Sequence, residues 1–177
     1  MQKFYPEYGA KKMVIRTVYP KDLEKIQHIA QTVWPITYSS IMSQEQISYM
    51  LEKMYSTESL NRQIKDERTV FLLAEGGVGA LGFVCYELNP VSINPVQLHK
   101  LYILPKAQGL GIGSEFLKIV CEVAKSNKRE FLKLRVHSQN SKAIEFYKRN
   151  GFVIESAELA ELGSGFSALD YIMKKCI

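Results

Sequence analysis

Three glycines, Gly109, Gly111 and Gly113, stand between an apolar stretch and a run of residues with helical spacing. The first amides of a helix have no partner within the helix, and glycines just ahead of them let an anion approach the backbone closely. The intervening Leu110 and Ile112 can anchor such a turn in the core. This spacing predicts a loop that binds the phosphates of a ligand through backbone N–H groups.

The loop does not match the two common nucleotide-binding patterns. A dinucleotide-binding loop requires a glycine three residues after Gly111, where this chain has Ser114. A Walker A loop requires Gly-Lys-Ser/Thr, which does not follow here. What remains is Gln108-x-x-Gly111-x-Gly113, and on its own this pattern leaves a purely structural glycine turn as an alternative.

A second group of residues suited to chemistry occupies residues 140–152, Asn-Ser-Lys-Ala-Ile-Glu-Phe-Tyr-Lys-Arg-Asn-Gly-Phe. Asn140 suits the N-cap of a helix, and Gly151 can end that helix in a left-handed conformation. Taken alone, Phe146 and Tyr147 on such an amphipathic helix would be interpreted as core packing.

Together the two patterns resemble the GNAT superfamily of acyl-CoA-dependent N-acetyltransferases. Its members carry Gln/Arg-x-x-Gly-x-Gly/Ala between a strand and a helix, followed by Asn-x-x-Ala-x-x-Phe-Tyr-x-x-x-Gly-Phe, and this chain matches each specified position. The resemblance covers roughly residues 69–174. It implies an enzyme that transfers an acetyl group from acetyl-coenzyme A to an amine by direct attack within a ternary complex, with no metal.

The resemblance also implies roles for these residues. The loop amides would bind the pyrophosphate of coenzyme A, Asn140 would contact its pantetheine arm, and Tyr147 would protonate the departing thiolate as a general acid. Backbone N–H groups of the strand before the loop would stabilise the oxyanion if that strand splays from its neighbour. The expected coenzyme contacts are Leu101, Tyr102, Ile103, Gln108, Gly109, Leu110, Gly111, Ile112, Gly113, Ser114, Asn140, Ala143 and Phe146.

The acceptor amine must lose its proton before it attacks. An alkylamine with a pKa of about 10.4 is neutral in only about one molecule in two thousand at pH 7. His99 is the first candidate for the base, and strand alternation would place it on one face with Gln97, Leu101 and Ile103. Glu87 and ordered water are alternatives for proton removal, and His99 could instead be a hydrogen-bonded core residue. Gln97, where many GNAT enzymes have Glu, cannot act as a base.

The acceptor is expected to bind among aromatic and polar residues. Candidates for this site are Trp34, Tyr38, Glu87 and Gln97, with ordinary core packing as the alternative for the two aromatic residues. A small-molecule amine is the first interpretation. A protein N-terminal acetyltransferase of the ribosomal-protein type and a non-catalytic acyl-CoA sensor are the alternatives.

A polyamine is one candidate for that small amine. The N-terminal half and the end of the chain look similar to bacterial spermidine/spermine acetyltransferases. Polyamines are cations, so acidic residues are wanted, although the net charge of +5 argues against an acidic site. The carboxylates that could supply the negative charge are Glu75, Glu87, Glu155, Glu158 and Glu161.

Hydrophobic periodicity and turn residues predict an α+β fold with a mixed, mostly antiparallel sheet. The resemblance implies a GNAT-like twisted sheet, flanked by helices on both faces. Strands are expected at 12–18 (an edge strand), 69–75, 78–88, 97–104, 131–136, 152–160 and 168–174, with a loop at 89–95. A helix that opens near Tyr19 is expected to break at Pro35. Further helices are expected to begin at Ser43, at Thr57, after the glycine loop and at Ser141.

At 177 residues and 46% apolar composition, the chain is expected to fold as one GNAT domain, residues 1–177, with a flexible N-terminal tail at 1–10. Scattered Lys and Arg argue against nucleic acid binding, and no apolar run is long enough to span a membrane. Cys85, Cys121 and Cys176 are expected to be buried thiols of a cytoplasmic protein. The expected partners are acetyl-coenzyme A and a small-molecule amine, and a homodimer is left open.

Overall fold

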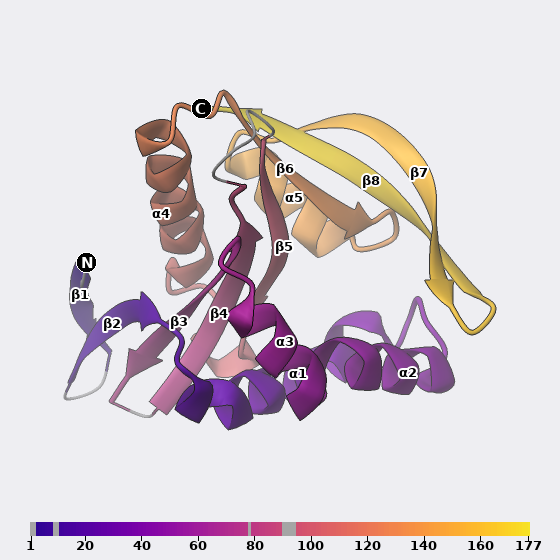
Figure 1. Ribbon diagram of the computed structural model, residues 1–177, viewed down its shortest axis with the longest axis horizontal. Helices are drawn as coiled ribbons and strands as arrows, with labels where there is room; N and C mark the ends of the chain where they lie inside the picture. Colours follow the sequence, from indigo (N-terminus) through magenta and orange to yellow (C-terminus); the bar gives the residue numbers. More distant parts are fainter. Residues whose placement is uncertain (1–2, 9–10, 78, 90–94) are drawn as a thin grey trace.

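An eight-stranded sheet runs through the molecule in the computed structural model, which describes residues 3–8, 11–77, 79–89 and 95–177 (Figure 1). Neighbouring strands follow the order β1-β2-β3-β4-β5-β6-β8-β7. All pairs are antiparallel except β5 and β6, so the prediction of a mixed, mostly antiparallel sheet is confirmed. The strands are β1 (Lys3–Tyr8), β2 (Lys11–Thr17), β3 (Thr69–Gly76), β4 (Gly79–Glu87), β5 (Val96–Ile103), β6 (Phe131–His137), β7 (Val153–Gly163) and β8 (Phe166–Cys176).

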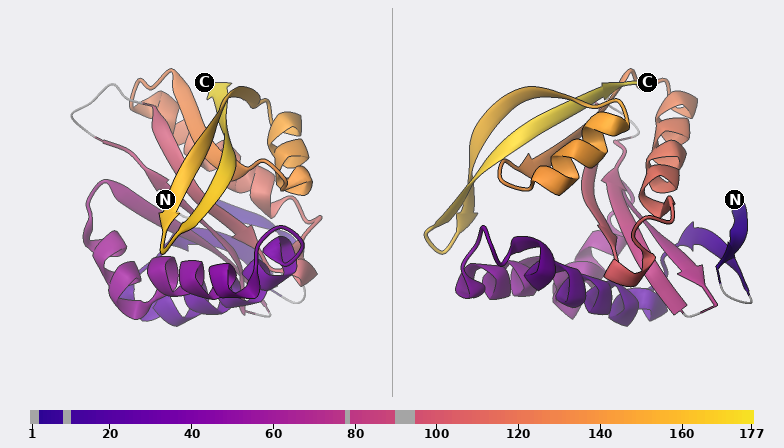
Figure 2. Two further views of the ribbon diagram at one scale, coloured as in Figure 1. Left: turned by 90° about the vertical axis from the view of Figure 1, so that its right-hand side faces the viewer. Right: turned by 180° about the vertical axis from the view of Figure 1, so that it is seen from behind.

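Helices cover both faces of this sheet, as predicted (Figure 2). One core joins the first three helices to alternate residues of β3 and β4, such as Phe71 and Phe83. The second core joins the last two helices to the alternate residues of β3 and β4 that face the other side of the sheet, such as Leu72 and Val84. The helices are α1 (Leu23–Tyr38), α2 (Gln44–Tyr55), α3 (Thr57–Lys65), α4 (Ile112–Ser126) and α5 (Ser141–Arg149), with 3-10 turns η1 (Pro20–Asp22) and η2 (Pro105–Ala107). No helix in the described ranges is long and apolar enough to cross a membrane.

Capping residues set the helix boundaries largely as predicted. The Ser43 hydroxyl accepts the Gln46 N–H at 3.1 Å, and the Asn140 carboxamide oxygen accepts the Ala143 N–H at 3.2 Å. Gly151 follows α5 with φ of +85°, a left-handed conformation that favours glycine.

Pro35 does not break α1, contrary to the prediction. The helix continues to Tyr38, and the Ser39 N–H donates to the Pro35 carbonyl at 3.1 Å. Proline removes only one helical hydrogen bond here, on an exposed side of the helix, while the neighbouring Val33 and Trp34 stay buried. Side-chain burial therefore outweighs the local penalty.

Two N-terminal expectations also differ from the structure. The stretch expected to be a flexible tail contains β1, which pairs antiparallel with β2. For this reason β2 is not an edge strand, since it lies between β1 and β3. The expected loop at 89–95 falls mostly on residues 90–94, which lie outside the described residues.

The cysteines are only partly as expected. Cys85 is a buried thiol, but Cys121 is half-buried and Cys176, near the end of β8, is exposed. All three are free thiols. All three cysteines have apolar neighbours in the sequence, so the sequence did not show which of them would be buried.

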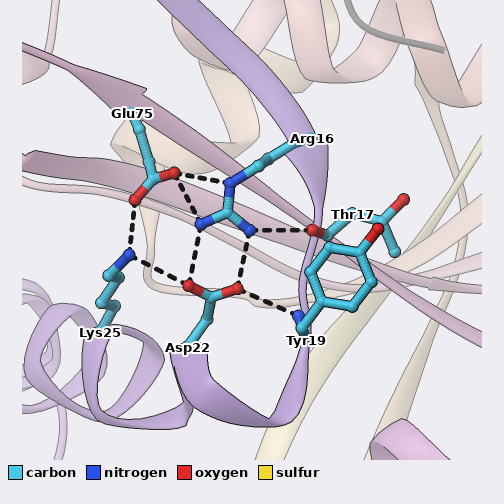
Figure 3. Close-up of polar contacts among 6 residues, drawn as sticks. All are labelled: Arg16, Thr17, Tyr19, Asp22, Lys25 and Glu75. Atoms are coloured by element: carbon cyan, nitrogen blue, oxygen red, sulfur yellow. Dashed lines mark hydrogen bonds and ion pairs between the residues drawn. The ribbon is translucent and has the colours of Figure 1, made fainter.

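Four charged side chains fasten the start of α1 to the sheet (Figure 3). The Arg16 guanidinium on β2 donates two hydrogen bonds to the Asp22 carboxylate, at 2.7 and 2.8 Å, and one to Glu75 on β3 at 2.7 Å. The Lys25 ammonium bridges the same two carboxylates, at 3.0 and 2.7 Å. The Asp22 side chain is only 1% exposed, so this network replaces the hydrogen bonds to water that its carboxylate has lost.

β7 and β8 form a long hairpin, here called the arm, which extends from the body of the sheet towards α2 (Figure 1). Each strand has 11 residues and runs past the predicted boundaries. The Tyr49 hydroxyl and the Lys53 ammonium of α2 both donate to the Leu162 carbonyl at the arm's tip. At Gly163, a Cβ would lie 2.4 Å from the Tyr49 hydroxyl oxygen, so glycine permits this close contact.

Candidate active site

The glycine loop has the backbone shape that its composition suggests. Gly109 and Gly111 have φ of +80° and +78°, and Gly111 is the residue from which α4 starts. The Gln108 side-chain amide donates to the Ile103 carbonyl at 3.2 Å and so ties the loop to the end of β5. The first amides of α4 are therefore presented at the end of β5, as an anion site requires.

Gly113 brings the two sequence patterns into contact. A Cβ at this position would lie 2.9 Å from Cζ of Phe146 on α5 and 3.7 Å from Cδ2 of Leu101 on β5. The first turn of α4 therefore packs directly on the Phe146 ring, and a larger residue would separate them. This contact joins three of the elements expected to hold coenzyme A.

β5 and β6 separate beside this loop. Their parallel pairing extends only from Val96 opposite Leu132 to Leu98 opposite Leu134. The Leu104 N–H donates to Leu81 on β4 at 2.8 Å. The direction of backbone groups alternates along a strand. The N–H and C=O of Tyr102 therefore also face β4, whereas those of Leu101 and Ile103 face the gap between β5 and β6. The gap between β5 and β6 is called the splay below.

These residues fit coenzyme A, which carries the acetyl group in the expected reaction. Coenzyme A needs amides for its phosphates and a strand edge with free N–H and C=O groups for its amide-bearing arm. The glycine loop supplies the first, and the N–H and C=O of Leu101 with the N–H of Ile103 supply the second, since the Ile103 C=O accepts from Gln108. The described residues contain no group of three or more His, Cys, Asp and Glu side chains able to hold a metal ion.

A β-bulge changes the predicted faces of β5. Cys85 pairs with Lys100 and Tyr86 with Leu98, which leaves His99 as the extra residue. After the bulge the alternation is inverted, so the expectation that His99 and Gln97 share a face with Leu101 and Ile103 is wrong. Leu101 and Ile103 pack against the α4–α5 core.

Lys100 follows the bulge and points into the opposite core. Its ammonium lies 5.4 Å from the ring centroid of Phe71 and 5.8 Å from that of Tyr55, and it donates to the Gln63 side chain. Burial lowers the pKa of Lys100. The bulge thus turns Lys100 inwards and leaves His99 at the surface of the splay.

His99 and Glu87 form a pair at the edge of this splay. The His99 Nε2 lies 3.2 Å from a Glu87 carboxylate oxygen, and the two side chains are 39% and 35% exposed. Burial lowers the pKa of His99, and the hydrogen bond to Glu87 raises it in part. The imidazole is consequently neutral at pH 7 and able to accept a proton.

Tyr147 lies on α5 and belongs to the core that α4 and α5 form with the sheet. Its side chain is buried, 8% exposed, and packs on the rings of Phe146 and Phe152 at centroid distances of 5.3 and 5.5 Å. Burial raises the pKa of Tyr147, and the hydroxyl of Tyr38 contributes to the shift. Tyr147 and Tyr38, from opposite faces of the sheet, therefore influence each other electrostatically.

Tyr38 lies at the edge of an aromatic cluster between α1 and β5, in which Trp34, Tyr55 and Tyr102 contact one another. Its hydroxyl lies 3.5 Å from that of Tyr102, and its ring lies 4.6 Å from that of Trp34. Burial raises the pKa of Tyr38, hydrogen bonding to Tyr102 and Asn140 opposes the shift, and Asp170 adds to it. Trp34 Nε1 and the Tyr55 hydroxyl are buried in this cluster, and neither has a hydrogen-bond partner among the residues that the structure describes.

A pocket of about 340 Å³ lies over the point where β5 and β6 part. It is lined by Gln97, His99, Lys133, Arg135, Glu155, Ser156, Glu158 and Ile172. Two of its carboxylates are already paired, Glu155 with Lys133 and Lys174, and Glu158 with Arg135. The pocket is therefore charged but nearly balanced.

The predicted acidic residues fall in three places. Glu87, Glu155 and Glu158 lie at or beside the pocket, but Glu75 belongs to the ion-pair network of β2 and β3. Glu161 is exposed near the arm's tip. The acidic patch expected from all five therefore does not form.

Sequence reasoning missed Asp170 on β8. Asp170 lies opposite His137 on the neighbouring strand β6. It is also close enough to Tyr38 to influence the pKa of Tyr38. Burial raises the pKa of Asp170, against the opposing effect of His137 and Arg135, and it has no ion pair among the described residues. It belongs to the end of the chain that carries part of the resemblance, but only the position of β8 beside β6 shows that it approaches Tyr38.

Comparisons with known proteins agree with this geometry. The family described as acetyltransferase (GNAT) domain matches residues 38–174. Spermidine N(1)-acetyltransferase of Thermoplasma acidophilum is 32% identical over 91% of this chain and 95% of its own length. The crystal structure of PaiA N-acetyltransferase from Thermoplasma acidophilum in complex with coenzyme A has a TM-score of 0.78 at 28% identity, covering 93% of this chain and 99% of that one. The ribosomal-protein-S18-alanine N-acetyltransferase of Escherichia coli shares the fold, with a TM-score of 0.69 at 17% identity, over 93% of this chain and 94% of that one.

Proposed function

The chain belongs to the GNAT acetyltransferase family, and we propose that it transfers the acetyl group of acetyl-coenzyme A to a primary amine of a small cationic molecule, a polyamine in particular. The observation that carries the proposal is the meeting, beside the splay, of Gly113 of the glycine loop, Leu101 of the β5 edge and Phe146 of α5, the helix that also carries Tyr147. Similarity to a spermidine acetyltransferase over nearly the whole chain supports the choice of acceptor.

The donor half of the site holds a thioester in place. The amides from Gln108 to Gly113 neutralise the phosphates, and Asn140, Ala143 and Phe146 line the path from the loop to the splay. One of the two N–H groups that face the splay, that of Leu101 or that of Ile103, donates to the carbonyl oxygen as it becomes an oxyanion. The other is left for the pantetheine arm of coenzyme A, because the two lie about 6.6 Å apart along the strand. Such preorganised donors are typically worth about 3–4 kcal/mol of transition-state stabilisation each.

Two side chains manage the protons of direct attack. His99 takes the proton of the ammonium ion, with Glu87 orienting the imidazole, so that the neutral nitrogen can bond to the carbonyl carbon. The second proton, which the nitrogen gives up once the carbon–nitrogen bond has formed, replaces the one that Tyr147 loses. When the carbon–sulfur bond breaks, the Tyr147 hydroxyl donates its proton to the thiolate. The raised pKa of Tyr147 keeps this proton in place until sulfur carries negative charge.

The acceptor binds between α1 and the arm. Gln97 lines the pocket beside His99. Tyr38, whose ring packs on Trp34, is not among the residues that line this pocket, and it would serve as an aromatic wall beyond it. Asp170 supplies a carboxylate that no side chain of the described chain neutralises by an ion pair. Aromatic faces and a carboxylate together favour an ammonium group.

A thiol-release assay tests this function. Purified full-length protein is incubated with acetyl-coenzyme A and a panel of polyamines, amino acids and N-terminal peptides, and free thiol is measured. We expect turnover with polyamines. Turnover with peptides alone would replace the proposal with protein N-terminal acetylation, and binding of coenzyme A with no turnover on any amine would favour a sensor.

A further inference from the structure

The pocket over the splay is lined by basic side chains as well as acidic ones. Lys133 and Arg135 of β6 contribute positive charge to its wall, and Glu155 and Glu158 of β7 contribute negative charge. A polyamine carries ammonium groups only, so it can use the two carboxylates but is repelled by the two cations. The mixed lining suits a ligand that carries charges of both signs.

The ion pair between Arg135 and Glu158 is the part of this lining that a ligand can open most easily. The Arg135 guanidinium donates to the Glu158 carboxylate, and the two side chains are 47% and 48% exposed. Ion pairs that are this exposed contribute little to stability, because water screens them. Glu155 is held more firmly, since both Lys133 and Lys174 pair with it.

The head group of a free amino acid can replace both partners of this pair at once. Its α-carboxylate can accept two parallel hydrogen bonds from Arg135, and its α-ammonium can donate to Glu158. A diamine replaces only the partner of Glu158 and leaves Arg135 unpaired, whereas a simple carboxylic acid replaces only the partner of Arg135. A zwitterion is therefore the ligand that leaves neither side chain without a partner.

The order of the strands decides which amine of such a ligand reaches the splay. Arg135 is on β6 and Glu158 is on β7, with β8 between them, while His99 is on β5 beyond β6. Neighbouring strands lie about 4.8 Å apart, so β7 is about 14 Å from β5. An α-amine is one carbon from its carboxylate and cannot reach His99 while the head group lies between Arg135 and Glu158. An amine at the end of a chain of several methylene groups can.

We propose that the protein also acetylates the side-chain amine of a free α,ω-diamino acid of about the length of lysine, with Arg135 binding the α-carboxylate and Glu158 the α-ammonium. This inference rests on the proposed function and adds a second class of acceptor to it. The side-chain nitrogen forms a bond to the acetyl carbon as the carbon–sulfur bond breaks. The products are the ω-acetylated amino acid, coenzyme A and one proton.

A matched pair of acceptors tests the proposal. Free lysine and 1,5-diaminopentane present the same amine on the same chain and differ only in the α-carboxylate. Thiol release by the full-length protein with acetyl-coenzyme A gives kcat/KM for each, and we expect lysine to be acetylated at least as efficiently as the diamine.

Arg135→Gln should raise the KM for lysine by about tenfold or more, because it removes hydrogen bonds to a charged group. The KM for 1,5-diaminopentane should fall, because Glu158 loses its own cation and becomes free to bind the second ammonium. A general loss of structure would raise both values. Arg135→Lys should retain part of the affinity for lysine, since it keeps the charge but not the paired donors. Arg62→Gln, at an exposed residue of α3 outside this pocket, is the matched control and should change neither KM.

A binding measurement separates failure of this inference from failure of the proposed function. Nε-acetyllysine has the head group but no reactive amine, and calorimetry measures its affinity for the protein saturated with coenzyme A. We expect it to bind, and to bind at least tenfold more weakly to Arg135→Gln. Acetylation of 1,5-diaminopentane with neither turnover of lysine nor binding of Nε-acetyllysine would overturn the inference and leave the proposed function intact. If no amine is acetylated, the proposed function fails and calorimetry alone decides whether the head-group site exists.

Discussion

The Tyr147 hydroxyl has the environment that a late proton donor needs. Burial raises its pKa, with a contribution from Tyr38, so it stays protonated throughout the neutral range. Its ring packs on Phe146 and Phe152, so the proposed chemical role rests on the hydroxyl alone.

We therefore expect Tyr147→Phe to lower kcat by more than about tenfold, because general acid catalysis commonly contributes about 10²–10⁴-fold. Affinity for acetyl-coenzyme A should barely change, since the ring remains. Steady-state kinetics and calorimetry measure the two effects. Tyr86→Phe, at another buried tyrosine, is the control and should retain turnover. Unchanged turnover of Tyr147→Phe would remove it from the mechanism.

His99 should determine the acid side of the pH–rate profile. Its pKa is lowered, so the neutral base persists below pH 6.5, and kcat/KM should fall only at more acidic pH. Glu87→Gln removes the hydrogen bond that raises this pKa, so the inflection should move to still lower pH. His99→Gln should lower kcat/KM by about 10²-fold and abolish the inflection. A profile unaffected by His99→Gln would assign proton removal to water.

Short contiguous patterns made part of the site predictable at the level of single residues. The steric need for glycine at 109 and 111 and the Asn140 cap can be inferred from neighbours in the chain, because the forces involved are local. The role of Gly113 is different, because its contact with Phe146 depends on how two helices pack. The expected catalytic role of Tyr147 stays a prediction.

At the scale of elements, the ion-pair network of Arg16, Asp22, Lys25 and Glu75 is the clearest stability device. Hydrogen bonds from Arg16 lower the pKa of Asp22 well below its usual range, although burial opposes this. Burial alone would raise the pKa of Glu75, but hydrogen bonds from Lys25 and Arg16 outweigh it and lower the pKa. Both carboxylates therefore favour the folded state while they are ionised.

Stability should decrease as the pH falls below about 4, where the unfolded carboxylates become protonated first and the folded ones must follow. Asp22→Asn should cost about 3 kcal/mol at pH 7, because it leaves Arg16 without its main partner in a buried site. It should also flatten the dependence of stability on acidic pH. Urea unfolding at pH 7 and pH 3 measures both effects, and a variant as stable as the wild type at pH 7 would contradict them.

Interruptions inside elements were the hardest features to predict. The bulge at His99 exists only relative to β4, because the count of residues on both strands defines it. Pro35 stays helical because its neighbours are buried against the sheet. Hydrophobic periodicity gave the positions of the elements, but such exceptions depend on partners that are distant in the chain.

At the scale of the whole molecule, topology assembles the acceptor side of the site. β8 lies between β6 and β7, which brings Asp170 beside His137 and towards Tyr38 at the end of α1. Lys133 and Arg135 reach the pocket by the same arrangement. These residues could not be predicted from the sequence, because strand order is not encoded in any local pattern.

Asp170→Asn should raise the KM for a polyamine by about tenfold or more, since a hydrogen bond to a charged group is worth about 1.5–3 kcal/mol. The KM for acetyl-coenzyme A should not change. Glu24→Gln, at an exposed carboxylate of α1, is the control. An unchanged polyamine KM would show that Asp170 does not recognise the acceptor.

The separation of β5 from β6 has a consequence for solvent exchange. The amides of Leu101 and Ile103 sit in the middle of an eight-stranded sheet, yet they face away from β4 and beyond the paired segment of β6. In deuterium-labelling experiments they should exchange orders of magnitude faster than their neighbours Lys100 and Tyr102. Coenzyme A should slow them selectively, which would make these two amides a direct reporter of donor binding in the absence of any acceptor.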